Sequence, residues 1–243
     1  MPISGQIRAS AGTVARLRLR WQLGRFMAAT KDCRATQEET LASLLELNGQ
    51  SDLAIQNGLG NASTPADLDK AVSVTDYSFY REAIERAKRG ETQALLGPKN
   101  RLMMFTLSSG TTSDSKFIPV TNRFYSDYRR SWQLWGISAF DARPKMKALK
   151  IVQLSSDYQR FMSEGGTPCG NISGLAAAMQ KPAVKLLYTL PSILAKIDNA
   201  ANKYYTALRL AIADPYVGML TTANPSTLVH MAQMADDRKE ELI

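Results

Sequence analysis

The 243-residue chain is long enough to bury a sizeable core, and its 44% hydrophobic and 21% charged content argues against general disorder. The net charge is +8, but six of these charges precede the first acidic residue, Asp32, so the body carries only +2. The surplus is confined to one terminus and no base-stacking motif accompanies it, which disfavours nucleic acid as a partner. No run approaches the roughly 18 apolar residues of a transmembrane segment.

The basic segment, residues 1–35, forms the first predicted region, and residues 36–243 form the second. Apolar side chains recur near helical spacing between Val14 and Met27, which predicts an amphipathic leading helix packed on the domain. An organelle transit peptide or a membrane-surface helix would also be basic and poor in acidic residues. Packing on the domain is the preferred interpretation.

Cys33 and Cys169 are isolated in the sequence and lack the spacing of metal or redox motifs. Two such cysteines fit a reducing compartment better than a disulfide framework. We therefore expect a cytoplasmic protein and no metal site built from this chain's own side chains.

Further along the chain, helices are expected to alternate with short apolar strands. The predicted helices cover residues 36–47, a short stretch from Pro65, 77–89, 122–140, 191–213 and 226–242. The predicted strands cover 102–107, 148–154 and 217–221. This alternation predicts an α/β fold, with helices packed on a mixed or parallel sheet.

The most informative junction lies where the strand over 102–107 runs into a loop rich in serine and threonine. Gly110 supplies backbone freedom, Lys116 supplies a cation, and the hydroxyl donors are Ser108, Ser109, Thr111, Thr112 and Ser113. These are the requirements of a polyphosphate-binding loop, although a solvated turn can have the same composition. A nucleotide P-loop is excluded, because Ser115 stands where its second glycine belongs.

The segment from Ser108 to Thr121 reads Ser-Ser-Gly-Thr-Thr-x-x-x-Lys-x-Ile-Pro-x-Thr. It resembles the first signature of the adenylate-forming superfamily, and its Ile-Pro-x-Thr ending resembles the auxin-responsive-promoter (Gretchen Hagen) family of acyl-amido synthetases and its bacterial relatives. Three further segments are similar to that family: 72–91, 165–175 and 224–228. The wider superfamily often has glycine at position 113 and proline at position 115.

The resemblance implies ATP and Mg²⁺ as cofactors, with a small carboxylate and an amine or amino acid as substrates. An acyl-adenylate would form first, and the amine would then displace AMP. Within this scheme Ser108–Ser113 would bind the ATP phosphates and Lys116 would neutralise their charge. The family's glutamate-containing adenine and metal segment, ribose-binding aspartate and mobile lid are expected beyond residue 243, so the chain reads as an amino-terminal fragment of the large domain.

Two alternatives stay open from the sequence. An acyl-CoA or acyl-protein ligase would share the first half-reaction, and a truncated, non-catalytic binding protein would perform neither step. The acyl substrate, the amine acceptor and the oligomeric state are not specified by any motif.

Three other side chains have chemistry that could suit a functional role. Trp132 and Trp135 are candidates for lining an acyl pocket, but buried tryptophans more often serve packing. His230 is the sole histidine and lies in a predicted surface helix, where a catalytic role is disfavoured despite the suitable chemistry of imidazole.

Overall fold

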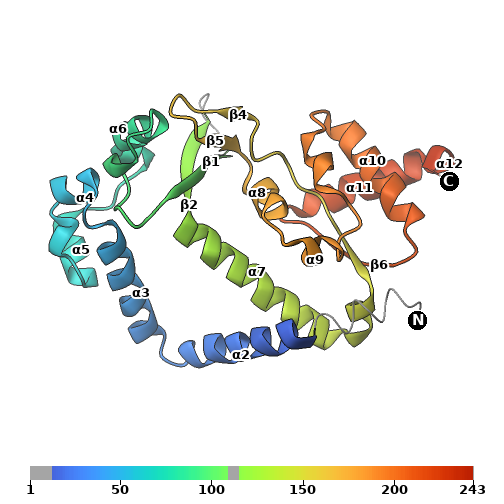
Figure 1. The fold of residues 1–243 in the computed structure, drawn as a ribbon, viewed down its shortest axis with the longest axis horizontal. Helices are drawn as coiled ribbons and strands as arrows, with labels where there is room; N and C mark the ends of the chain where they lie inside the picture. The colour runs from blue at the N-terminus through green and yellow to red at the C-terminus, as the bar shows by residue number, and fades with distance from the viewer. Residues whose placement is uncertain (1–12, 109–114, 243) are drawn as a thin grey trace. The chain divides into compact units, whose positions relative to one another are not determined.

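The structure is a computed structural model that describes residues 13–108 and 115–242. The chain divides into two compact units. The hairpin unit contains residues 21–132 and 158–170, and the β3–β6 unit contains the residues up to Arg20, 133–157 and 171 onward. Figure 1 shows the order of the elements along the chain.

The hairpin unit begins with helices and continues into a four-stranded mixed sheet. Its helical segments are α3 (Cys33–Asn48), α4 (Asp52–Gln56), η1 (Leu59–Asn61), α5 (Pro65–Ala71), α6 (Tyr77–Lys88) and η2 (Thr92–Ala94). Its strands are β1 (Leu102–Ser108), β2 (Lys116–Thr121), β4 (Phe161–Met162) and β5 (Pro168–Gly170), in the order β2-β1-β5-β4. The pair β1–β5 is parallel, and the pairs β1–β2 and β4–β5 are antiparallel. The expected α/β fold with a mixed sheet is therefore confirmed.

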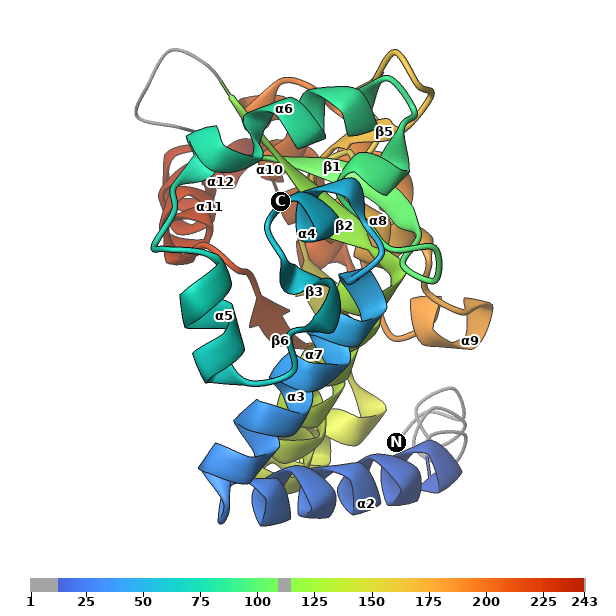
Figure 2. The same cartoon turned by 90° about the vertical axis from the view of Figure 1, so that its left-hand side faces the viewer.

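The core of the hairpin unit forms where α6 packs on β1 and β5, and Figures 1 and 2 show α6 beside these strands. Ile84 and Ala87 of α6 meet Phe105 of β1 and Cys169 of β5, and all four are buried. The spacing of the two helix residues places them on one face, as in an amphipathic helix. Burial of this face fixes α6 against the strand that leads into the serine-rich loop.

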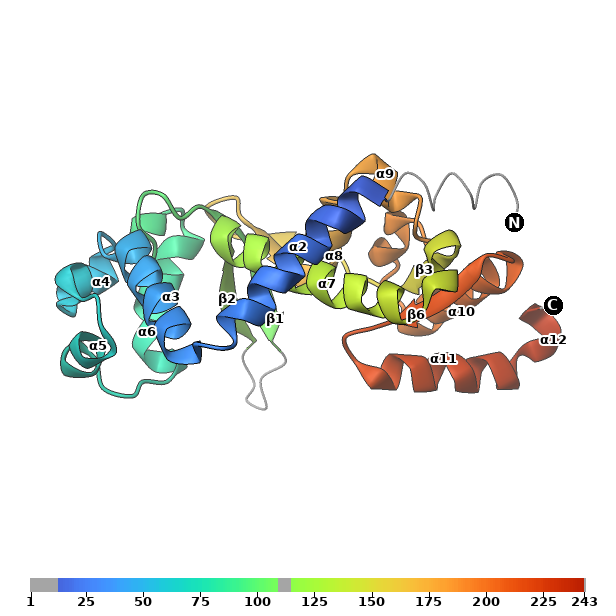
Figure 3. The same ribbon diagram turned by 90° about the horizontal axis from the view of Figure 1, so that it is seen from below.

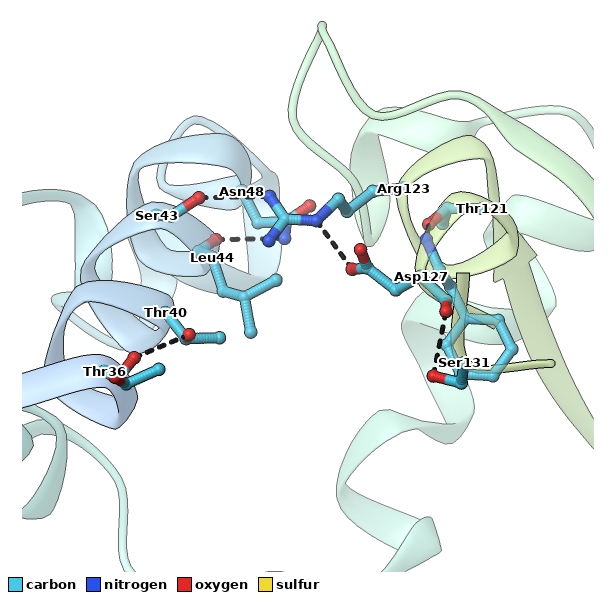
Figure 4. A network of polar contacts seen from close by, with 10 residues as sticks. Thr36, Thr40, Ser43, Leu44, Asn48, Thr121, Arg123, Asp127 and Ser131 are labelled. Atoms are coloured by element: carbon cyan, nitrogen blue, oxygen red, sulfur yellow. Dashed lines mark hydrogen bonds and ion pairs between the residues drawn. The ribbon is translucent and has the colours of Figure 1, made fainter. Parts of the chain in front are cut away.

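A polar network connects α3 with α7 (Asn122–Ala142), the helix that follows β2 (Figure 4). The guanidinium of Arg123 donates from Nη1 to Ser43 Oγ at 3.1 Å and from Nε to Asp127 Oδ2 at 2.8 Å. Thr121 Oγ1 accepts the backbone N–H of Phe124 and so satisfies a donor in the first turn of α7. Helix α7 thus starts where β2 ends.

The β3–β6 unit is built on a parallel pair of strands, β3 (Lys150–Gln153) and β6 (Val217–Thr221). The connecting segment contains α8 (Ile172–Ala178), α9 (Pro182–Lys185), η4 (Ser192–Lys196) and α10 (Ala200–Ala213), and η3 (Pro144–Ala148) precedes β3. Helices α11 (Pro225–Asp237) and α12 (Lys239–Leu242) follow β6, and Figure 3 shows α10 beside α11. Val152, Ala207 and Met231 are buried in the shared core.

Several helix boundaries differ from the sequence predictions. Helix α3 begins at Cys33 rather than Thr36, because Asp32 accepts the Ala35 N–H and caps the helix earlier. The single helix expected over 191–213 is broken, because the Asn199 side chain accepts the Asn202 N–H and starts α10 anew. The helix expected over 226–242 is divided at Arg238 into α11 and α12.

An amino-terminal helix, α2 (Thr13–Ala29), is present, but four of its large apolar side chains are exposed. Leu17, Trp21, Phe26 and Met27 are 54–61% exposed. Apolar and basic residues surround the helix instead of separating onto two faces, so the expectation of an amphipathic helix was wrong. Over residues 13–108 and 115–242, no helix has the length and hydropathy of a membrane span.

Candidate functional site

The candidate site lies at the loop end of the β1–β2 hairpin. Ser108 is the last residue of β1 and Lys116 is the first of β2, and the two are direct partners in the antiparallel register. Directly opposed residues in such a pair have Cβ atoms about 4.5–5.5 Å apart. The hairpin therefore brings Lys116 back to the point where the chain enters the serine-rich loop.

The structure describes only the two ends of the predicted phosphate loop. Ser108 is half-buried and Lys116 is exposed. Ser109, Gly110, Thr111, Thr112 and Ser113 lie outside the described residues. Their assignment to phosphate binding stays a prediction, as does the role of Lys116 in charge neutralisation.

The residue after Lys116 is held firmly by its neighbours. The Phe117 ring packs edge-on against Phe105 and Phe161, with centroid distances of 6.0 and 6.2 Å. Lys88 Nζ lies 4.1 Å from the centroid of the same ring, a cation–π geometry, and also contacts the Glu85 carboxylate. Lys116 is therefore followed directly by Phe117, a residue whose ring is held in place by its neighbours.

Two glycine-containing motifs that are far apart in the sequence meet at the end of α6. Gly165 donates its N–H to Lys88 O at 2.7 Å, and a Cβ at position 165 would lie 2.4 Å from Gly90 N. Gly90 itself has φ +104°, a conformation that favours glycine. The sequence indicated both motifs but not their contact, which arises because the segment between β4 and β5 folds back onto α6.

The two tryptophan candidates for an acyl pocket lie on α7 in different environments. Trp132 is half-buried, with its ring centroid 6.3 Å from that of Tyr128. Trp135 is 49% exposed. Their role as pocket residues stays a prediction. His230 is exposed on α11, and its ring centroid lies 6.1 Å from that of Tyr204.

A cavity of about 330 Å³ lies within the β3–β6 unit, where no site was predicted. Its walls include Leu154, Tyr188, Leu190 and Lys203, but none of the predicted site residues. Burial raises the pKa of the Tyr188 hydroxyl, and a hydrogen bond with Gln180 only partly opposes this effect. No motif in the sequence indicates this cavity, because its lining mixes apolar and polar residues from several separate segments.

The residues that the structure describes contain no group of three histidine, cysteine, aspartate or glutamate side chains arranged to hold a metal ion. Magnesium in phosphoryl-transfer sites is commonly held by one or two carboxylates together with the substrate phosphates. No described residue is therefore assigned to Mg²⁺. The exposed ammonium of Lys116 suits a phosphate, and it forms no ion pair with any residue in the described part of the chain.

Comparison with solved structures supports the architecture. The chain is similar to a structure described as GH3.15 acyl acid amido synthetase, with a TM-score of 0.77 and 17% identity. The match covers 90% of this chain and 39% of that one. A second structure, AtGH3.15 acyl acid amido synthetase in complex with 2,4-DB, gives a TM-score of 0.74 with 16% identity, covering 93% of this chain and 39% of the other.

Comparison by sequence gives relatives among plant enzymes. Jasmonoyl–L-amino acid synthetase JAR6 of Nicotiana attenuata is 29% identical over 151 residues, and JAR4 of the same plant is 25% identical over 146 residues. Each match covers 60% of this chain, which spans about a quarter of the length of either relative. The model of the GH3 family N-terminal domain matches residues 22–243, nearly the whole chain, and this chain is therefore a member of the GH3 family.

Proposed function

We propose that this chain forms part of an acyl acid amido synthetase. A small carboxylate attacks the α-phosphorus of ATP, which forms an acyl-adenylate and releases pyrophosphate. An amine or amino acid then displaces AMP and forms the amide. Family membership supports the overall activity. The observation that carries the ATP-binding part of the proposal is the register pair Ser108–Lys116, which joins a cation to the entrance of a hydroxyl-rich loop.

In this scheme Lys116 offsets negative charge on the ATP phosphates. A lysine ammonium acts as a compact point charge, and its flexible stem lets it follow the phosphate as charge shifts during displacement. Hydroxyl and backbone N–H groups of Ser108–Ser113 would orient the same phosphates. Positioning and charge stabilisation of this kind supply most of the catalysis in phosphoryl transfer. No covalent nucleophile is needed from the chain.

ATP would supply the activated phosphorus and the AMP leaving group. Mg²⁺ would accompany the phosphates, with protein ligands outside the described residues. The names of the relatives indicate their substrate classes. The two Nicotiana attenuata enzymes are named for a jasmonoyl group and an amino acid, and the structural neighbours are named for an acyl acid. We extend the general class, a carboxylate and an amino acid, to this chain, and we propose a cytoplasmic location on the basis of its two free cysteines.

The test is carboxylate-dependent exchange between ATP and labelled pyrophosphate. The assay should use the native polypeptide that contains this chain, after its intact mass has been measured. The wild-type protein is expected to support exchange with a panel of small carboxylates. Lys116→Met should reduce exchange by at least about 100-fold, because removal of one preorganised charge-stabilising donor costs roughly that much. Lys99→Met is the matched control, since Lys99 is exposed and precedes β1, so the length of that strand separates it from the loop.

Three outcomes would contradict the proposal. No exchange with any carboxylate would favour a binding protein without synthetase activity. Release of AMP only on addition of coenzyme A or a protein thiol would indicate a thioester ligase instead of an amide synthetase. An equal loss of exchange activity in the Lys116 and Lys99 variants would show that Lys116 has no specific role at the phosphate site.

A further inference from the structure

Helix α6 begins at the motif Asp76–Tyr77, to which the proposed function assigns no role. Asp76 is the N-cap of α6 and accepts the Ser78 N–H, and Tyr77 is the first residue of the helix. The Tyr77 ring is half-buried and packs against the core cluster of the hairpin unit, which includes Ile84 and Phe105. The start of this helix is therefore fixed with respect to β1 and β2.

The Tyr77 hydroxyl reaches the backbone of β2 directly beside Lys116. It accepts the N–H of Phe117 at 3.0 Å and lies 3.4 Å from Phe117 O, to which it can donate. Strand β2 is one of the two edge strands of the four-stranded sheet. An outer strand has N–H and C=O groups that no neighbouring strand satisfies. One phenol hydroxyl thus takes the place of a neighbouring strand at this position.

The same tyrosine also contacts the lysine itself. Lys116 Nζ lies 5.5 Å from the centroid of the Tyr77 ring, within the range of a cation–π contact. The neighbouring Asp76 carboxylate has a lowered pKa, chiefly through hydrogen bonds from the Ser78 hydroxyl and N–H and to a smaller extent through the charge of Lys116. Backbone, ring and charge contacts from the start of α6 therefore all converge on Lys116 and Phe117.

We propose that Tyr77 is a positioning residue that sets the place of Lys116 at the mouth of the phosphate loop. This inference rests on the proposed function. The hydroxyl holds the β2 backbone at Phe117, and the ring supports the ammonium of Lys116 from the side. Tyr77 touches no reacting atom in this scheme and acts only through Lys116.

The test compares Tyr77→Phe with Tyr80→Phe. Both tyrosines lie at the start of α6, but the Tyr80 hydroxyl contacts Thr75 Oγ1 at 3.2 Å instead of β2. Tyr77→Phe keeps the ring and its packing, so the variant is expected to fold. Its KM for ATP in pyrophosphate exchange should rise about two- to tenfold, which is the effect of one lost hydrogen bond. Its KM for the carboxylate should change little. Tyr80→Phe should match the wild type.

Two further measurements separate positioning from general destabilisation. Hydrogen exchange at the Phe117 amide should accelerate in Tyr77→Phe but not in Tyr80→Phe, because the amide loses its acceptor. In a Lys116→Met background, adding Tyr77→Phe should leave the dissociation constant for ATP unchanged.

An active wild type combined with an unchanged KM in Tyr77→Phe would overturn this inference alone. An additive loss of ATP affinity in the double variant would also overturn it, because Tyr77 would then act independently of Lys116. Absence of exchange in the wild-type protein would overturn the proposed function and this inference with it.

Discussion

The hairpin unit and the β3–β6 unit both have an apolar core, but they differ in the contacts outside it. In the hairpin unit, other groups lie very close to the backbone. Gly165 lies against the backbone of Gly90, and the Tyr77 hydroxyl accepts the Phe117 N–H. In the β3–β6 unit, the main contacts join side chains, with an apolar cluster around Val152 and an ion pair between Lys150 and Asp214.

This difference explains why most recognisable motifs fall in the hairpin unit. A close backbone approach accepts only glycine, and a side chain that bonds to a strand edge must have the right length and end in a polar group. An apolar core accepts many combinations of similar total volume. Contacts to the backbone therefore leave a readable pattern in the sequence, whereas packing between side chains leaves mainly hydrophobic periodicity.

The largest effect is expected from Gly165→Ala. The added methyl group would lie 2.4 Å from Gly90 N and 2.6 Å from Arg89 C, backbone atoms that cannot rotate away. We expect a loss of about 3 kcal/mol in unfolding free energy, the upper end of the usual cost of overpacking. Denaturant unfolding measures this loss. Gly136→Ala is the control, since no atom lies within 4 Å of its added Cβ, and a helical alanine there should stabilise by up to about 1 kcal/mol.

The contact between Gly165 and Gly90 would be disproved as a packing constraint if the two alanine variants had the same stability. An intermediate loss of about 1 kcal/mol at position 165 would mean that the loop moves aside. The comparison between the two units would then be weaker, because the backbone contact would be adaptable.

The second-largest loss of unfolding free energy is expected from Lys150→Met in the β3–β6 unit. Lys150 Nζ lies 2.8 Å from Asp214 Oδ2, and the Asp214 side chain is only 12% exposed. Removal of the cation leaves a largely buried carboxylate with the Thr189 hydroxyl and Tyr216 N–H as remaining partners. We expect a loss of about 1–2 kcal/mol. Lys145→Met, at an exposed position, should change stability by less than about 0.5 kcal/mol.

The same carboxylate predicts a pH dependence. Burial opposes ionisation of Asp214, but hydrogen bonds from Lys150, Tyr216 N–H and Thr189 outweigh it and hold its pKa below the usual value. A lowered folded-state pKa stabilises the protein above the unfolded-state value of about 3.9, and this contribution is lost as pH falls through the folded-state value. Asp214→Asn should therefore be less stable than the wild type at pH 7, and the difference should shrink as the pH falls below about 4. A difference that is constant from pH 7 to pH 3 would contradict this interpretation.

The smallest effect is expected from Arg123→Ala, which removes the contacts with Ser43 and Asp127 in Figure 4. The Arg123 side chain is 35% exposed and Asp127 is 48% exposed, so water screens much of their attraction. A loss of about 0.2–1 kcal/mol is expected from thermal or denaturant unfolding. A loss above about 2 kcal/mol would show that the hairpin unit depends on side-chain contacts as strongly as the β3–β6 unit.

The sequence determined most element types because hydrophobic periodicity and caps are local. The strand over 217–221 and the helix starting at Tyr77 agree with the structure. Strand β2 is absent from the sequence predictions, because Pro119 within a short run argues against a strand. It forms because the antiparallel register with β1 satisfies its inner edge.

For the candidate site, the sequence supplied the composition on which the predicted phosphate loop rests and the resemblance to a family, and the family model confirms that resemblance. Hydroxyl groups, glycine and lysine at short spacing are properties that a linear sequence records. Only the tertiary structure decided that Tyr77 reaches Phe117, 40 residues away, and that Gly165 rests on Gly90. Such contacts depend on the tertiary arrangement of strands and helices, and no local propensity specifies that arrangement.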